Sequence, residues 1–303
     1  MGTLCTVIIV MTVLAAACSG DGPAQDNAEA KGQVDEAPGS QPAASQPAAP
    51  EPTTTTTAAA TTTTTPPPAP TTAPPAPPPT SAIGTVPPQG LGPGDRGPQV
   101  KALEDLLAAL KYGVHTLDDA YDNDTADSVV AFQKAAGLPR TGRATQDVVD
   151  ALAVARPPDP LVAGGGATRV EIDLPRQILL LYQNDALSRV FPVSTASGKR
   201  FCHGGRCRTA VTPAGSYRVG YRIPGWRKSP LGRMYKPVYY MVGIGIAIHG
   251  YHQVPPEPAS HGCVRIPMKA AEWFPDQVPD GTPVYVIDGK TPLGPPPPEG
   301  TQT

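Results

Sequence analysis

One stretch of this chain limits where a compact fold can form. Residues 21–90 are dominated by Pro, Thr and Ala and carry almost no large apolar side chains. A segment of this composition cannot bury enough apolar surface to offset the entropy lost on ordering, so we expect a disordered tether over residues 19–90. Extended at about 3.1 Å per residue, it would span on the order of 200 Å. The compact part of the protein is therefore expected after residue 90.

The N-terminal end predicts export. Residues 4–17 form an apolar run that is short for a transmembrane helix and typical of the hydrophobic region of a signal peptide. The run leads into Leu14-Ala15-Ala16-Ala17-Cys18-Ser19, which resembles a bacterial lipobox. This resemblance implies a signal peptide over residues 1–18, a lipid on Cys18 and attachment to the outer face of the cell membrane. Simple secretion is the alternative, because residues 1–3 carry no Lys or Arg.

Residues 91–156 carry an apolar pattern of helical period. Apolar side chains recur at steps of three and four from Val100 to Leu110, which places them on one face of a helix. Similar patterns predict two further helices, over about residues 126–136 and 145–155. Three helices of this length are enough for a small all-α bundle.

After a linker at residues 157–166, the pattern changes to short runs rich in β-branched and aromatic residues, separated by Gly, Pro and Asn-Asp. The predicted strands are 169–174, 177–182, 187–193, 215–221, 238–241, 244–249 and 282–287. One helix is expected over residues 268–274. We therefore predict a multi-domain chain in which a mostly antiparallel β-sandwich-like domain, residues 167–289, follows the helical bundle. A Pro-rich disordered tail is expected over residues 290–303.

The five cysteines separate by context. Cys5 lies inside the predicted signal peptide, and Cys18 is the predicted lipidation site. Cys202 and Cys207 form a close pair in a Gly- and Arg-rich loop, which in an exported protein predicts a disulfide. A zinc site built from this pair and the adjacent His203 is the competitor, although the spacing fits no common zinc pattern. Cys263 would then be the free thiol of the mature protein.

Reactive residue types gather around this free thiol. Ser260-His261-Gly262-Cys263-Val264-Arg265 follows His249, which lies fourteen residues before the cysteine. Cysteine reacts as its thiolate, and a nearby imidazole lowers the thiol pKa or takes its proton. His249 ends an apolar run, so we expect it at a strand end facing the same pocket. These residues are the minimum set for acyl transfer through a thioester.

The motif resembles the active-site signature of the L,D-transpeptidase family, with its YkuD-like catalytic domain. The likeness extends to residues 170–182, 191–195 and 212–217 and covers roughly residues 167–289. It implies the same β-rich fold.

The helical segment carries a second resemblance. Residues 94–100, 130–134 and 137–142 resemble the three-helix peptidoglycan-binding module. That likeness implies a module that holds the enzyme on its polymer and so raises the effective substrate concentration.

The catalytic resemblance assigns roles to the motif. It implies that Cys263 is the nucleophile, that His249 is the proton donor and acceptor, and that His261 supports the geometry. The backbone N–H groups of Gly262 and Cys263 could stabilise an oxyanion. No metal and no other cofactor are implied.

Three residues are predicted to contact the substrate. Arg265 could bind a carboxylate in a bidentate manner or brace its loop. Ser260 could orient His261 or cap the following turn. Tyr240 is expected to line the cleft, although alternating aromatic residues on a strand more often pack in a core. The same strand offers further candidates for this role: Tyr235, Tyr239 and Met241.

Other classes of site and partner are weaker alternatives. A zinc site would combine four side chains: His249, His252, His261 and Cys263. No carboxylate lies where a zinc hydrolase needs its general base, which argues against this site. A redox role for the Cys202 and Cys207 pair lacks the Cys-x-x-Cys spacing. Predicted export and the small number of aromatic signals argue against nucleic acid as a partner.

Charge and resemblance together predict a cell-wall enzyme. Residues 167–290 contain sixteen Lys and Arg against eight Asp and Glu, an excess of +8 that suits a carboxylate-bearing substrate. The family implies that Cys263 attacks a peptidoglycan stem peptide, releases D-alanine and passes the acyl group to an amine, forming a 3→3 cross-link. Water as acceptor would make the protein an L,D-carboxypeptidase, and a protein amine would make it an anchoring enzyme. A non-catalytic wall-binding lipoprotein is the rival class.

Overall fold

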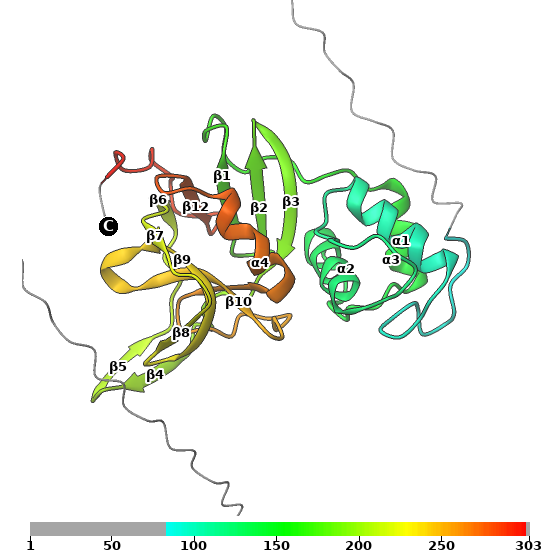
Figure 1. Ribbon diagram of the computed structural model, residues 1–303, viewed down its shortest axis with the longest axis horizontal. Coiled ribbons are helices and arrows are strands. Elements are labelled where there is room, and N and C mark those ends of the chain that lie inside the picture. Colours follow the sequence, from blue (N-terminus) through cyan, green and yellow to red (C-terminus); the bar gives the residue numbers. More distant parts are fainter. Residues whose placement is uncertain (1–82, 301–303) are drawn as a thin grey trace, which may run out of the picture. The chain divides into compact units, whose positions relative to one another are not determined.

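The computed structural model describes residues 83–300 of the chain. The predicted signal peptide, Cys18 and most of the tether lie outside the described residues. Three helices come first and a β-rich domain follows (Figure 1), so the predicted fold class is confirmed.

The helical module is built from three helices with clear local signals. They are α1 (Pro98–Ala109), α2 (Asn123–Ala136) and α3 (Gln146–Val154). At the start of α2, the side chain of Asp122 accepts hydrogen bonds from the backbone N–H groups of Asp124 and Thr125. Gly137 ends the helix in the left-handed conformation, with φ of 70°, that glycine adopts without strain.

The helical module begins before its predicted start at residue 91. Ile83 and Val86 are buried in its apolar core. Gln99 Nε2 donates a hydrogen bond of 2.6 Å to the Ile83 carbonyl. The predicted tether boundary at residue 90 is therefore wrong, because two apolar residues within a Pro- and Thr-rich context are enough to fix this segment to the bundle.

The β domain contains two sheets. The first has the strand order β3-β2-β1-β12-β6, with β1 and β12 parallel and the other neighbours antiparallel. Its strands are β1 (Arg169–Asp173), β2 (Ile178–Gln183), β3 (Ala186–Pro192), β6 (Gly215–Arg218) and β12 (Pro283–Ile287).

The second sheet has the order β11-β10-β9-β7, and β8 also pairs with β9. Its strands are β7 (Tyr221–Arg222), β8 (Trp226–Ser229), β9 (Gly232–Met241), β10 (Ile246–Tyr251) and β11 (Val264–Pro267). β10 and β11 are parallel, and the short 3-10 helix η2 (Val242–Ile244) joins β9 to β10. A separate hairpin consists of β4 (Arg200–His203) and β5 (Arg206–Thr209).

Helix α4 (Met268–Gln277) packs closely against the second sheet. Its side chains Ala271 and Phe274 are buried in one apolar cluster with residues of both sheets. Gly250 on β10 permits the contact, because a Cβ atom at this position would lie 2.7 Å from the Ala271 Cβ atom. The glycine after His249 is thus explained by helix packing.

The C-terminal tail, predicted to be disordered from residue 290, is described as far as residue 300. Ser216 Oγ donates a hydrogen bond to the Gly294 carbonyl, and Arg218 Nε donates to the Pro297 carbonyl. β6 is an edge strand, and two of its side chains thus bind carbonyl groups of the Pro-rich segment.

The helical module and the first sheet share an apolar cluster. Leu180 on β2 and Val190 on β3 belong to the same buried group as Leu107 and Phe132 of the helices.

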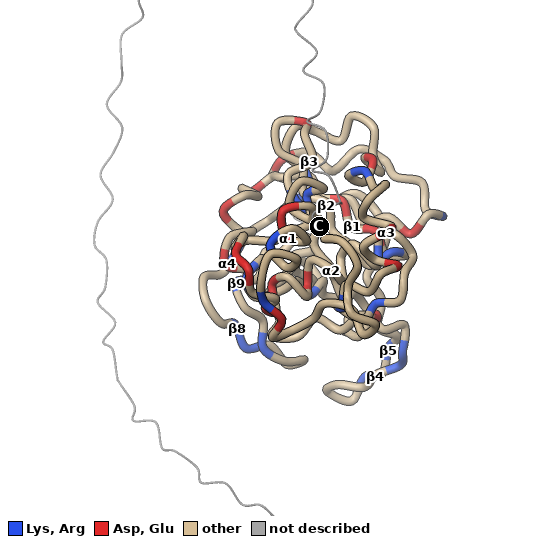
Figure 2. The backbone as a smooth tube through the Cα atoms, turned by 90° about the vertical axis from the view of Figure 1, so that its right-hand side faces the viewer, with Lys and Arg blue, Asp and Glu red and all other residues tan. Residues whose placement is uncertain are grey.

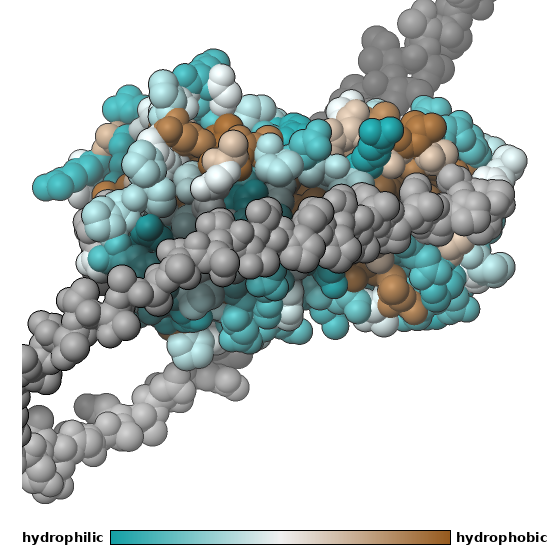
Figure 3. Space-filling view, turned by 90° about the horizontal axis from the view of Figure 1, so that it is seen from above, coloured by the Kyte–Doolittle hydropathy of each residue, from teal (hydrophilic) through white to brown (hydrophobic). Residues whose placement is uncertain are grey.

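The face in Figure 3 is largely hydrophilic, with hydrophobic side chains in separate patches. Within residues 83–300, none of the helices combines the length and the apolar character needed to span a bilayer.

Candidate active site

Parallel pairing of β10 and β11 brings His249 and Cys263 together. His249 pairs in register with Arg265, so Cys263 lies immediately before β11, beside β10. Parallel neighbours require a crossover connection of about a dozen residues. Residues 252–263 supply it, and we call them the crossover. The fourteen-residue interval between histidine and cysteine therefore reflects the length of this connection.

His249 and Cys263 open into one cavity of about 680 Å³. The β4–β5 hairpin and the β8–β9 turn form its other walls. Its lining includes five basic residues and no Asp or Glu from the described chain. Figure 2 shows part of this positive charge as blue segments on β8 and on the hairpin. The basic residues are Arg208, Arg227, Lys228, Arg233 and Arg265. The cavity is thus suited to a ligand with negative charge.

His249 is held as a neutral imidazole. The residue is 4% exposed, and Nδ1 lies 2.9 Å from the Gly250 carbonyl, to which it donates a hydrogen bond. This leaves Nε2 as the acceptor nitrogen. Burial lowers the pKa of His249 to about 4, and the Arg265 charge acts in the same direction, while the Gly250 hydrogen bond opposes them.

Cys263 is likewise neutral near pH 7. Burial raises the pKa of its thiol above the ordinary value, while the Ala247 backbone and the Arg265 charge act in the opposite direction. Its sulfur lies 3.9 Å from the Gly245 carbonyl. The pair is therefore a neutral thiol and a neutral imidazole acceptor that line one cavity, which suits general-base activation of the nucleophile.

The Ser260 hydroxyl is used inside the turn that presents Cys263. It donates to the Cys263 carbonyl at 2.6 Å and accepts from the Gly262 N–H at 3.1 Å. Ser260 is 2% exposed. Of the roles considered for it, turn capping is the one that these hydrogen bonds show, and Ser260 also lines the cavity.

Gly262 lies in a closely packed position. A Cβ atom there would lie 3.2 Å from the Val211 carbonyl oxygen, and the Gly262 carbonyl accepts a hydrogen bond from Thr212 Oγ1 at 2.7 Å. Its N–H, the predicted oxyanion donor, is engaged by Ser260. An oxyanion role for this N–H would thus require the serine hydroxyl to release it.

His261 connects the motif to the hairpin. Its side chain is exposed, and its ring centroid lies 4.6 Å from that of Phe201 on β4 in an edge-on arrangement. Cys202 and Cys207 pair across the hairpin in a disulfide with an S–S distance of 1.98 Å. Neither thiol is then left for the zinc alternative. The imidazole is in position to support the hairpin wall of the cavity.

Tyr240 does not line the cavity, so its predicted substrate contact is wrong. It is 1% exposed, its ring centroid lies 5.5 Å from that of Tyr217, and its hydroxyl has no partner among the described residues. Tyr239 lines the cavity instead and stacks on Tyr221 with 4.5 Å between ring centroids. Successive side chains of a strand face opposite sides of the sheet. Tyr239 therefore faces the cavity, and the next residue, Tyr240, faces the core.

Arg265 is held over an aromatic ring with donor capacity left. Its guanidinium carbon lies 4.2 Å from the ring centroid of Tyr251. Its Nε is buried and has no hydrogen-bond partner within the described structure. The side chain also lines the cavity, so N–H groups at the end of its guanidinium can be offered to a ligand carboxylate.

The histidines do not assemble a metal site. His252 is exposed and packs on Trp226, with 5.2 Å between ring centroids, whereas His249 is buried. Across residues 83–300, no three His, Cys, Asp or Glu side chains lie close enough to hold a metal ion.

Two walls of the cavity were missed from the sequence. The hairpin strands β4 and β5 and strand β8 are mostly exposed and charged, so they lack the alternating apolar pattern that marks a strand. The sequence signal that could have indicated the hairpin wall is the cluster of Arg residues around Cys202 and Cys207.

Comparisons with known proteins match both parts of the described chain. Residues 167–286 match the L,D-transpeptidase catalytic domain, and residues 96–152 match a putative peptidoglycan binding domain. A search of the curated proteins found no match.

Solved structures include a similar enzyme. The chain is 37% identical to the L,D-transpeptidase from Xylanimonas cellulosilytica, with a TM-score of 0.62, over 66% of this chain and 98% of that one. The L,D-transpeptidase from Stackebrandtia nassauensis is 22% identical, with a TM-score of 0.39, over 70% of this chain and 99% of that one. With a thiol, an imidazole and a catalytic-domain match at the same residues, the chain belongs to the L,D-transpeptidase family and carries an N-terminal peptidoglycan-binding domain.

Proposed function

We propose that this enzyme forms 3→3 cross-links between peptidoglycan stem peptides through a thioester on Cys263, with release of D-alanine. The observation that supports this best is the neutral pair of Cys263 and His249, which lines a basic cavity. A thioester needs a nucleophile that can be deprotonated on demand, and a carboxylate-bearing peptide needs cationic walls.

The reaction would proceed in two steps. His249 Nε2 takes the thiol proton as the sulfur attacks the carbonyl carbon of the third stem residue. The backbone N–H of Cys263 stabilises the oxyanion, and the imidazolium returns its proton to the nitrogen of the departing D-alanine. An acceptor amine then attacks the thioester, its proton passes through His249, and the cysteine leaves as the thiol. The product is a new amide bond.

The remaining residues of the site would hold the substrate and the turn. Arg265 binds a carboxylate through its guanidinium, Tyr239 provides an apolar wall, and His261 supports the hairpin. Ser260 acts through the turn that carries Cys263 rather than through the substrate.

The enzyme would act outside the cell. A lipid on Cys18 and a tether of on the order of 200 Å would let it reach the wall from the membrane. Labelling the protein with a radioactive fatty acid tests this anchor. Label that is absent, or that persists in Cys18→Ser, would contradict it.

Product analysis with a purified tetrapeptide donor tests the reaction. We expect loss of D-alanine, an acyl adduct on the intact protein and a cross-linked dimer when a second stem is present. Cys263→Ala should abolish all three, and His249→Ala should slow adduct formation. Release of D-alanine with only hydrolysed tripeptide would identify a carboxypeptidase, and release by Cys263→Ala would refute the mechanism.

A further inference from the structure

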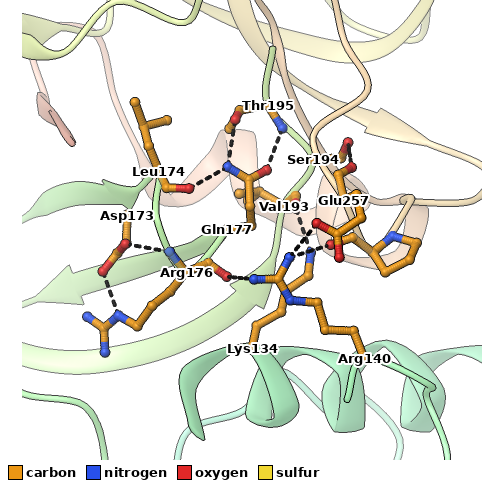
Figure 4. Close-up of polar contacts among 11 residues, drawn as sticks. Lys134, Arg140, Asp173, Leu174, Arg176, Gln177, Val193, Ser194, Thr195 and Glu257 are labelled. Carbon is orange, nitrogen blue, oxygen red and sulfur yellow. Dashed lines mark hydrogen bonds and ion pairs between the residues drawn. The ribbon is translucent and has the colours of Figure 1, made fainter. Parts of the chain in front are cut away.

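Arg140 of the helical module contacts the crossover that joins the two catalytic residues. It lies just after α2, and its Nη1 donates hydrogen bonds of 3.0 Å to the Pro256 carbonyl and to Glu257 Oε2 (Figure 4). Its Nη2 lies 3.5 Å from the Arg176 carbonyl of the β1–β2 turn. One guanidinium therefore connects the helical module, the first sheet and the crossover.

Lys134, on helix α2, makes a second connection from the helical module. It is 2% exposed, and its Nζ donates a hydrogen bond of 2.7 Å to the Val193 carbonyl at the end of β3. Burial lowers the pKa of Lys134 to about 7 because the amino group loses its hydration, and this bond replaces contacts that water would otherwise make. The contact fixes the chain immediately before Ser194 and Thr195.

These two contacts lead to the same part of the active site. Ser194 Oγ donates to the Glu257 carbonyl at 2.8 Å, and the backbones of Ser194 and Arg265 exchange two hydrogen bonds of 3.1 Å. The Thr195 carbonyl accepts from the Ser260 N–H at 2.9 Å. The segment held by Lys134 thus pairs with both sides of Cys263, and Arg140 holds the loop that leads to it.

The crossover has little support of its own. None of residues 252–259 is buried, and none belongs to a helix or strand. Pro255, Pro256 and Pro258 restrict its local conformations, but they do not fix where it lies. Its position therefore depends on contacts with other segments.

We propose that Arg140 is a positioning residue of the catalytic site, through which the peptidoglycan-binding domain holds the crossover and aligns Cys263 with His249. This inference rests on the proposed function of the two residues. It assigns the helical module a part in the rate of acylation that is separate from attachment to the wall.

The test measures acylation of the full-length protein by a soluble tetrapeptide donor, with no wall polymer present. Arg140→Gln should lower the maximal acylation rate by about tenfold or more, because misalignment of reacting groups is costly, and should change the half-saturating donor concentration much less. Arg156→Gln is the matched control, since it removes the same charge from an exposed residue of the module. Arg140→Lys should recover part of the rate.

Amide hydrogen exchange provides an independent readout. Exchange over residues 250–262 should be faster in Arg140→Gln than in Arg156→Gln. Glu257→Gln keeps the Pro256 contact, so it should show a smaller loss of rate in the same direction, and its exposed side chain makes misfolding no obstacle.

The outcomes separate this inference from the proposed function. A wild-type acylation rate in Arg140→Gln would overturn the positioning role, as would an equal loss in Arg156→Gln. Failure of the wild-type protein to form any adduct would instead refute the proposed function. Unchanged sedimentation of Arg140→Gln with purified wall, alongside slow acylation, would support positioning over attachment.

Discussion

Lowering the pH tests the neutral thiol and imidazole pair most directly. Burial lowers the pKa of His249 to about 4, whereas a free histidine has a pKa of about 6.5. Because the imidazole must accept the thiol proton, acylation should follow the fraction of neutral His249. A lowered pKa keeps the imidazole ring neutral at lower pH, so the acid limb of the pH–rate profile should shift to lower pH.

The size of the effect follows from the two pKa values. At pH 5.5, about 97% of the imidazole is neutral with a pKa of 4, but only about 9% with a pKa of 6.5. The structure thus predicts roughly tenfold more activity at pH 5.5 than an unperturbed histidine would allow.

The assay is the rate of adduct formation on Cys263 from a tetrapeptide donor between pH 4.5 and 8, at constant ionic strength. Circular dichroism at each pH shows whether the protein stays folded. We expect a nearly flat profile from pH 5.5 to 8. A half-maximal rate near pH 6.5 would refute the neutral buried pair. In Arg265→Gln the acid limb should move to higher pH, because the removed charge disfavours the imidazolium.

Three further predictions concern stability and substrate contact. Tyr240→Phe removes a buried hydroxyl without a partner, so the free energy of unfolding should stay the same or rise by up to about 1 kcal/mol, whereas Tyr239→Ala should raise KM. Chemical denaturation and steady-state kinetics measure these changes, and a raised KM for Tyr240→Phe would contradict the assignment. Replacing Cys202 and Cys207 by Ser should raise KM and speed proteolysis of the exposed hairpin; unchanged proteolysis would argue that the disulfide is dispensable. Gln177→Leu leaves Thr195 N–H and Oγ1 without their partner, so the free energy of unfolding should fall by about 2–4 kcal/mol. A decrease below about 0.5 kcal/mol would contradict the importance of these bonds.

The elements that the sequence predicts well are those with an apolar period. Helices α1, α2 and α3 and strands β1, β2 and β3 bury one or both faces, and their patterns indicate them directly. The Ser-His-Gly-Cys motif identifies the family because it combines a nucleophile, an imidazole and a glycine within four residues. These local signals lead to the fold class and to the enzyme family.

Other features depend on contacts that no local pattern records. Whether Tyr239 or Tyr240 faces the cavity depends on strand parity, and a bulge shifts the register between β9 and β10. The Ser260 hydroxyl could serve a turn or a substrate until the positions of the Gly262 N–H and the Cys263 carbonyl are known. Ile83 is held at the core by a hydrogen bond from Gln99, which lies sixteen residues further along the chain.

The apolar cluster shared by the helices and the first sheet has a consequence for cooperativity. Leu180 and Val190 lose apolar neighbours if the helices are removed, and exposed apolar surface of this kind favours aggregation. Two sequence domains should therefore melt as one unit, with a single calorimetric transition. Recombining this catalytic domain with a different wall-binding domain would then require a new partner for the exposed side of β2 and β3, and not only a new linker.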